Sequence, residues 1–170
     1  MAEFDELCVI LHCDTKQSEQ IIYTMNKELT IEDIQEIVAK DESRYLELKQ
    51  TTGELYKAMT SACAFLNTDG GWVMFGVTPK LKVVGQNVTD PTRQEIANAL
   101  RKFEPAIDVP VQYVEIPEKE GFYVIAMYFN PPAPTQAPYT FDARPYYKVE
   151  NTTAIMPREM FEARIRRSNP

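Results

Sequence analysis

The chain has 170 residues, 44% hydrophobic and 25% charged, an ordinary globular mixture that excludes wholesale disorder and a small disulfide-dependent scaffold. Its longest apolar stretch, residues 123–129, is far shorter than a membrane span, and its acidic start is unlike a secretory leader, so we expect a soluble cytoplasmic protein. The net charge of −7 disfavours a polyanionic partner, but all of the excess lies in residues 1–60, which hold 13 acidic and 6 basic residues. A basic face on the rest of the chain is compatible with this distribution.

Histidine and cysteine offer little for catalysis or metal binding. The single histidine, His12, is the only residue around which a Ser-His-Asp triad or a histidine-rich metal site can form. The three cysteines are an odd number without a C-x-x-C pair, which suits neither zinc nor a disulfide framework. We interpret them as buried thiols that pack as small hydrophobic groups.

The first clear elements begin after residues 1–28, which we treat as an extension of uncertain structure. A helix is predicted over residues 30–40, because its first four residues resemble a capping box and apolar residues follow at helical spacing. Residues 45–49 alternate between apolar and polar side chains, which predicts a half-buried strand with both leucines inward.

A second helix is predicted from an N-cap at Thr51 to about Asn67, where Asp69-Gly70-Gly71 ends it because glycine adopts left-handed dihedral angles without steric cost. The apolar run over residues 72–77 predicts a strand buried on both faces. A hairpin turn and a return strand over residues 81–84 are expected next.

In the second half, Asp90 is predicted to cap a helix that continues through Phe103 and ends before Pro105. Residues 111–116 and 122–129 predict an antiparallel pair, and residues 146–149 a last short strand.

A final helix is predicted from Pro157. We interpret Met160, Phe161 and Ile165 as its core face and the arginines at its end as partners of the helix dipole. The alternative is that Phe161, Ile165 and the arginines form a dimer or inter-domain contact. The order of elements predicts an α+β fold, a mixed β-sheet with flanking helices.

The most specific stretch is Ala64 to Val77, a helix end, a tight glycine turn and a buried strand. This structural interpretation is complete without a ligand, and we favour it. The alternative is a polar rim of Asn67, Thr68 and the glycine amides that a phosphate approaches. The stretch is neither a Walker phosphate loop nor a dinucleotide fingerprint, because no G-K-[ST] follows and the glycines precede the strand.

In combination, several segments resemble the Schlafen AlbA-type DNA-binding domain. They are the helix over residues 30–40, E-S-R-Y-L-E-L-K at 42–49, A-F-L-N-T-D-G-G at 64–71 with Gly76-Val77, and Y-Y-K at 146–148. The resemblance covers roughly residues 30–167 and implies an AlbA/Schlafen-like domain over residues 29–170. It further implies a fold that is often dimeric and that stands at the N-terminus of bacterial transcriptional regulators, some of them helicase-related. The chain is then either a stand-alone domain or the front of a longer protein with domains beyond Pro170.

Some Schlafen members are metal-dependent ribonucleases that use three acids, and two of these match Glu42 and Glu47 by motif. A spacing of five places the two carboxylates on opposite faces of a strand, so they share a cation only if a turn lies between them. The third position reads Thr78-Pro79, and Asp69 lies at the other end of the strand. Because two-metal chemistry needs more ligands, we interpret both glutamates as surface residues and expect no cofactor. Mg²⁺ or Mn²⁺ enters only with the nuclease alternative.

Five cations are candidates for contacts with a phosphate backbone: Lys49, Lys80, Lys82, Arg144 and Lys148. Each phosphate that they neutralise releases counterions and strengthens binding. The alternative is an ordinary surface of mixed charge. Of Tyr146 and Tyr147, which point to opposite faces, one is expected in the core and the other either stacks on an unpaired base or caps the sheet. Glu150, in place of the family's glycine, repels phosphate at that edge.

Three hypotheses follow. The first is a non-catalytic nucleic-acid-binding module, for which analogy favours DNA over RNA. The second is a metal-dependent nuclease that uses Glu42 and Glu47, and the third is a protein-interaction or oligomerisation module. The first requires that the five cations converge into one groove.

Overall fold

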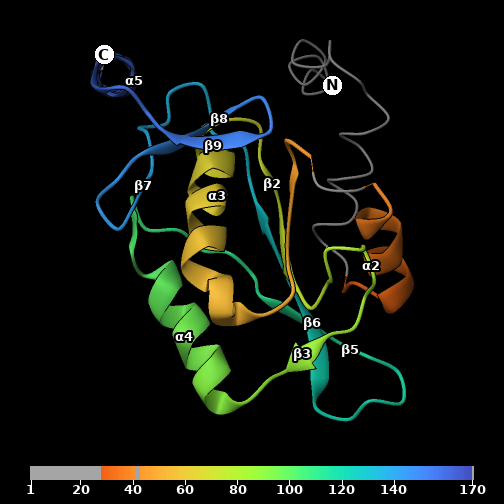
Figure 1. The fold of residues 1–170 in the computed structure, drawn as a ribbon. Helices are drawn as coiled ribbons and strands as arrows, with labels where there is room; N and C mark the ends of the chain where they lie inside the picture. Colours follow the sequence, from red (N-terminus) through yellow and green to blue (C-terminus); the bar gives the residue numbers. More distant parts are fainter. Residues whose placement is uncertain (1–27, 41–42, 170) are drawn as a thin grey trace, which may run out of the picture.

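A computed structural model describes residues 28–40 and 43–169 (Figure 1). The helices are α2 (Ile31–Val38), α3 (Leu55–Asn67), α4 (Asp90–Leu100) and α5 (Arg158–Ser168), with a short 3-10 helix, η1 (Thr52–Glu54), before α3. The strands are β1 (Leu46–Lys49), β2 (Gly71–Phe75), β3 (Gln86–Asn87), β4 (Phe103–Glu104), β5 (Gln112–Glu115), β6 (Phe122–Phe129), β7 (Thr140–Phe141), β8 (Tyr146–Val149) and β9 (Thr152–Ile155).

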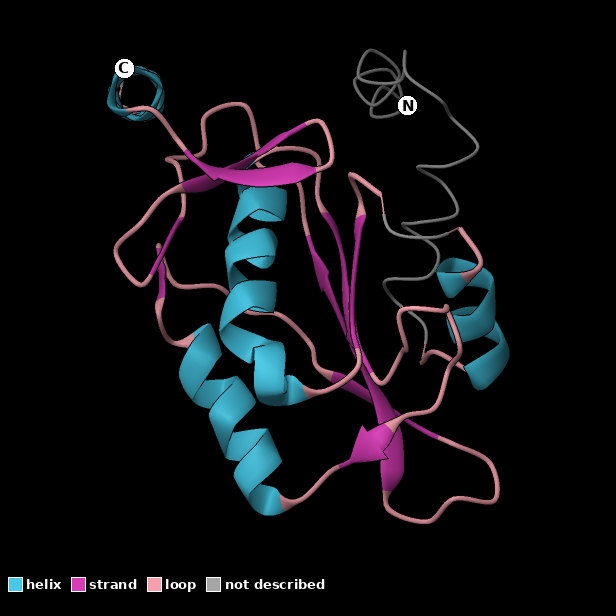
Figure 2. Cartoon of the chain, viewed as in Figure 1, coloured by secondary structure: helices cyan, strands magenta, loops and turns pink. Residues whose placement is uncertain are grey.

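The central sheet is mixed, which confirms the predicted α+β class (Figure 2). Strand β1 runs parallel to β2, and β6 is antiparallel to β2, β3 and β5. The long strand β6 is central: β2 and β3 lie along one of its edges and β5 along the other, since Tyr123 and Ile125 each pair on both sides. The predicted pairing of residues 111–116 with residues 122–129 is also confirmed.

Alternating side chains of the sheet supply two hydrophobic cores. On β2, Val73 and Phe75 belong to the core under α3, whereas Trp72 and Met74 belong to the core under α2. Every residue of β2 is buried, as the continuous apolar run predicts. The result is a layer of α3 and α4 on one face of the sheet and α2 on the other (Figure 1).

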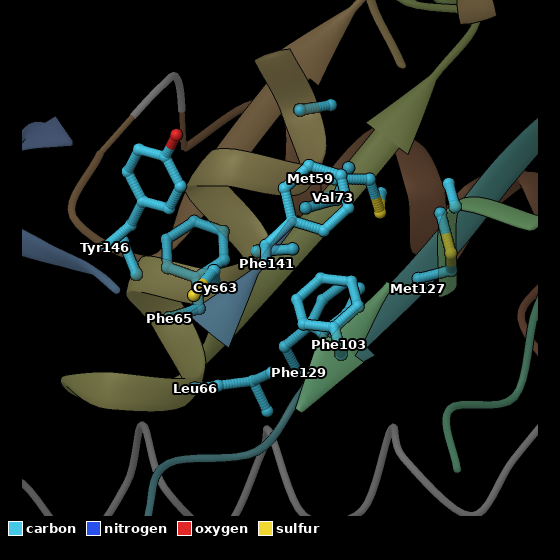
Figure 3. Packing of buried hydrophobic residues seen from close by; sticks show 14 of the residues in the cluster. Met59, Cys63, Phe65, Leu66, Val73, Phe103, Met127, Phe129, Phe141 and Tyr146 are labelled. Carbon is cyan, nitrogen blue, oxygen red and sulfur yellow. The ribbon is translucent and has the colours of Figure 1, made fainter. Parts of the chain in front are cut away.

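The core under α3 is the larger and is rich in aromatic rings. Phe103 packs between Phe129 and Phe141, with ring centroids 6.1 and 5.0 Å away (Figure 3). The hairpin of β8 and β9 crosses the C-terminal end of α3 and closes this core, to which β8 contributes Tyr146 (Figure 1).

The expected capping signals form. The Thr30 hydroxyl accepts a hydrogen bond from the Asp33 amide at 3.2 Å, and the Asp33 carboxylate accepts one from the Thr30 amide at 2.8 Å. The Thr51 hydroxyl accepts from the Gly53 amide and so caps η1, which leads directly into α3.

The predicted return strand over residues 81–84 is wrong. Only one bridge forms, between Val77 and Val83. Leu81 has φ of 61° and Gly85 has φ of 68°, so the chain turns away from β2 before a ladder extends. The next residues pair with β6 as β3 instead.

The boundaries of the third predicted helix are also corrected. Its N-cap is Thr89, which shares a capping box with Thr92, and Asp90 is the first helical residue. Phe103 lies beyond the helix in β4, where it pairs with Phe141, because its ring enters the core under α3.

Two C-terminal expectations need correction. Residues 146–149 are the first half of a hairpin, since Glu150 has φ of 53° and turns the chain back into β9. Helix α5 has no buried residue, so Met160, Phe161 and Ile165 are not a core face and are only half-buried.

Candidate nucleic-acid interface

Asn67, at the end of α3, is a structural hub. It is 2% exposed, and its amide nitrogen donates to the carbonyls of Tyr139 and Tyr146, both at 2.8 Å. Its amide oxygen accepts from the Tyr139 backbone nitrogen, also at 2.8 Å. The side chain therefore ties α3 to β8 and to the segment before β7, and its polar atoms are engaged within the protein.

The polar groups of the glycine turn, residues 68–71, also form hydrogen bonds within the protein. The Gly70 amide donates to the Phe65 carbonyl at 2.9 Å, and the Thr68 hydroxyl accepts from the Lys148 amide at 3.0 Å. Gly70 has φ of +73°, and a Cβ there would lie 2.8 Å from the Phe129 carbonyl oxygen. These groups hold the turn together, so the geometry favours the structural interpretation of this motif over the phosphate rim.

The candidate acids are separated or paired. Glu42 lies outside the described residues. The Glu47 carboxylate is 2.8 Å from the Lys49 ammonium, and both side chains are at most 15% exposed, so Glu47 is not the surface residue that we expected. Asp69 forms an ion pair with Arg44. Within residues 28–40 and 43–169, no group of three or more His, Cys, Asp or Glu side chains is arranged to hold a metal ion.

Two of the five candidate cations lie inside the fold. Lys148 is 5% exposed, and its ammonium lies 5.0 Å from the centre of the Phe65 ring. Lys49 is half-buried beside Glu47. Neither side chain is displayed for a phosphate backbone.

The three exposed candidates lie on opposite sides of the sheet. Lys80 and Lys82 belong to the loop after β2, whose Leu81 packs on the core under α2. Arg144 follows β7, beside the core under α3. The structure therefore does not gather the five cations into one groove.

Sequence reasoning considered the arginines of α5 only as a dimer or inter-domain contact or as partners of the helix dipole, and did not name them as nucleic-acid contacts. Arg166 and Arg167 are exposed in its last turn, and Arg158 pairs with Glu162 at 2.7 Å. Arg164 donates to the Asn67 carbonyl at 2.6 Å, which fixes α5 to the end of α3. Burial, and then the neighbouring Arg167, lowers the pKa of the Arg164 guanidinium. The signal in the sequence was four arginines in eleven residues.

The C-terminal region is also locally basic. Residues 144–169 hold six basic and three acidic residues. The excess acidity is mainly elsewhere: residues 1–27 and 41–42 hold seven acidic and two basic residues, which leaves 18 acidic and 16 basic among those described. The overall charge of −7 therefore understates how well this end of the molecule attracts anions.

The two adjacent tyrosines of β8 divide as their alternation predicts. Tyr146 is buried in the core under α3, and Tyr147 is half-buried on the other face. Tyr147 lies close enough to Arg164 to influence its pKa. Glu150 is exposed in the hairpin turn.

The fold of the chain is similar to that of a protein of known structure. A crystal structure of the DIP2311 protein from Corynebacterium diphtheriae is similar over 88% of this chain and 29% of that protein, with 19% identity and a TM-score of 0.52. This similarity shows a shared fold, and the chain spans less than a third of that protein's length.

No curated protein sequence matches the chain. None of the helices in the described part of the chain is long and apolar enough to cross a membrane. The family model described as Schlafen, AlbA_2 matches residues 42–157, which is more than half of the chain. That match includes β1, the glycine turn and the β8–β9 hairpin, and it is consistent with a nucleic-acid-binding domain. The chain belongs to the Schlafen AlbA_2 family.

Proposed function

We propose that residues 29–170 form a non-catalytic nucleic-acid-binding domain, the DNA-binding part of a cytoplasmic, bacterial-type transcriptional regulator. The observation that carries the proposal is the basic end of α5. Arg166 and Arg167 are exposed there, on a helix that has no buried residue. Family membership supports a nucleic acid as the polyanion.

The contacts proposed for this domain are chiefly to phosphate. Arginine donates several hydrogen bonds in a planar fork and keeps its charge, which suits phosphate oxygens. Arg166 and Arg167 are the main contacts. Arg144, which is exposed beside the core under α3, adds a further contact. Lys80 and Lys82 belong to a separate surface that contributes less, because their loop lies on the α2 side of the sheet.

The paired acids support a non-catalytic role. A carboxylate that binds a divalent cation must give up other partners, yet Glu47 is held by Lys49 and Asp69 by Arg44. These ion pairs engage Glu47, which matches one of the family's three acids, and Asp69, the nearest alternative in sequence to the missing third acid.

The test is the affinity for a fluorescent DNA duplex, measured by anisotropy. Replacing both Arg166 and Arg167 with glutamate is expected to weaken binding at least tenfold, since each lost phosphate contact also lowers counterion release. Lys119→Glu is the matched control, because Lys119 lies in the β5–β6 turn at the far end of the molecule from α5 (Figure 1).

Other outcomes assign the chain to the remaining hypotheses. Equal affinity of the double variant and the wild type, with loss on Lys80→Glu, moves the interface to the other surface. Mn²⁺-dependent cleavage of RNA that Glu47→Gln abolishes contradicts the non-catalytic proposal. No binding to any nucleic acid, together with a stable dimer by light scattering, favours an interaction module.

A further inference from the structure

An exposed tyrosine near the start of α3 is surrounded by groups that suit a nucleotide. Tyr56 is 50% exposed, although its ring packs against the buried Phe141 with centroids 5.2 Å apart. The Lys102 ammonium lies 5.9 Å from the centre of the same ring. An aromatic ring held in place by the core, half open to solvent, with a cation beside it, is a suitable surface for stacking a base.

The ring is also fixed in orientation. The Tyr56 hydroxyl donates to the Asp142 carboxylate at 3.1 Å, and the Asp142 amide donates to the Lys102 carbonyl at 3.1 Å. The hydrogen bond to Asp142 raises the pKa of the Tyr56 hydroxyl, and nearby Arg144 acts in the opposite direction. Lys102 therefore places a positive charge beside the ring, and the exposed Arg144 follows nearby, because its backbone is bridged to Phe141, on which the ring packs.

The placement on α3 connects this tyrosine to the proposed interface. Tyr56 precedes Asn67 by eleven residues, about three turns, so the two lie about 16 Å apart along the helix. Between them, the chain on either side of β7 covers the helix, since Cys63 is 0% and Asn67 2% exposed. Asn67 is where Arg164 anchors α5. Arg144 belongs to this covering chain, because its backbone carbonyl accepts from the Cys63 thiol, and its residue is exposed to solvent. A stacked strand rises 3.4 Å per nucleotide, so about five nucleotides cover the distance.

We propose that Tyr56 is a stacking site for an unpaired base, with Lys102 and Arg144 as contacts to its flanking phosphates. This inference rests on the proposed function and makes it more specific: the domain holds single-stranded nucleic acid at Tyr56 and across the exposed chain around Arg144 that covers α3, towards α5. A duplex keeps its bases stacked within the helix and gains nothing from this ring.

The experiment compares a single-stranded oligodeoxythymidylate, long enough to span both sites and carrying one 2-aminopurine, with a duplex of the same length. Tyr56→Leu keeps an apolar side chain against Phe141 but removes the aromatic face. It is expected to weaken single-strand binding about tenfold and to leave duplex binding unchanged. Tyr56→Phe keeps the ring and is expected to bind as the wild type does.

Tyr45→Leu is the matched control, because Tyr45 is 46% exposed but precedes β1, outside this surface. If the wild type binds single strands and Tyr56→Leu binds them equally well, the stacking site is overturned and the proposed function stands. If the wild type binds no nucleic acid, both are overturned. Should Tyr56→Leu fail to fold, 2-aminopurine fluorescence with the wild type decides: quenching supports stacking and an increase contradicts it.

Discussion

Helices α3 and α5 adjoin each other, yet they are built in opposite ways. Nine of the 13 residues of α3 are buried, and its end carries the most specific motif of the chain. None of the 11 residues of α5 is buried, and four are arginines. The two are joined where Arg164 of α5 donates to the Asn67 carbonyl of α3.

This difference separates scaffold from surface. The family motif A-F-L-N-T-D-G-G specifies a helix end, a turn and a strand whose polar groups are used internally. The groups free to meet a partner lie outside it, on α5 and beside the start of α3. Substitutions in the motif should therefore cost stability, and substitutions on α5 should cost binding.

The largest effect is expected at Asn67. Asn67→Ala leaves the backbone groups of Tyr139 and the carbonyl of Tyr146 without their buried partner. We expect the free energy of unfolding to fall by about 4 kcal/mol, measured by urea denaturation. Asn98→Ala is the control, because Asn98 is exposed on α4 and should change stability by less than about 0.5 kcal/mol. Equal losses in the two variants would contradict the role of Asn67 as a hub.

Gly70 is next. An alanine there must adopt φ of +73° and place its Cβ 2.7 Å from the Pro131 ring. We expect Gly70→Ala to cost about 3 kcal/mol. Gly121 has φ of +76° but an open surrounding, so Gly121→Ala should cost about 1 kcal/mol from backbone strain alone. Comparing the thermal unfolding of the two variants separates backbone strain from steric overlap. A Gly70→Ala protein as stable as the Gly121→Ala protein would contradict the close packing of Gly70 against Pro131.

The Glu47–Lys49 ion pair allows a comparison with a pair at the surface. Glu47→Gln removes a largely buried pair and should lower the free energy of unfolding by about 1 kcal/mol. Glu162→Gln removes a pair on α5 whose Arg158 is 90% exposed, and should cost less than about 0.5 kcal/mol. Chemical denaturation at low and high salt checks both, and only the surface pair should weaken further with salt.

The smallest effect concerns Cys63. Burial raises the pKa of its thiol to about 12, so the neutral thiol predominates at pH 8 and reacts slowly. In a variant without Cys8 and Cys13, a thiol reagent should label the native protein far more slowly than the unfolded one. Because the native state keeps this proton above pH 9 and the unfolded chain releases it, the contribution of Cys63 to stability falls as pH rises from 9 towards 12. Rapid native labelling would show an open core.

Much of the scaffold is predictable because local signals agree with tertiary burial. The capping box at Thr30 and the glycine turn after Asn67 specify their elements through contacts a few residues apart. The return strand after β2 failed because left-handed Leu81 and Gly85 redirect the chain. The β8–β9 hairpin was missed for a related reason, since Glu150 takes the turn conformation that glycine usually provides.

The candidate interface was less predictable. The sequence does not reveal which basic side chains are buried. Lys148 is buried between the β8–β9 hairpin and α3, for example, whereas Arg166 is exposed. The helical spacing of apolar residues in α5 suggested a core face that the fold does not cover. Tyr56 does not stand out in the sequence, because its neighbours Lys102 and Asp142 are distant along the chain.

The most direct test of the account is the salt dependence of DNA affinity in the wild type and in a variant with glutamine at positions 166 and 167. Each phosphate contact contributes about 0.9 to the slope of log affinity against log salt concentration for a duplex, and about 0.7 for a single strand. If Arg166 and Arg167 each contact a phosphate, the slope in the variant is smaller by about two contacts, and its unfolding is unchanged. An identical slope in both proteins would contradict the claim that α5 carries the interface.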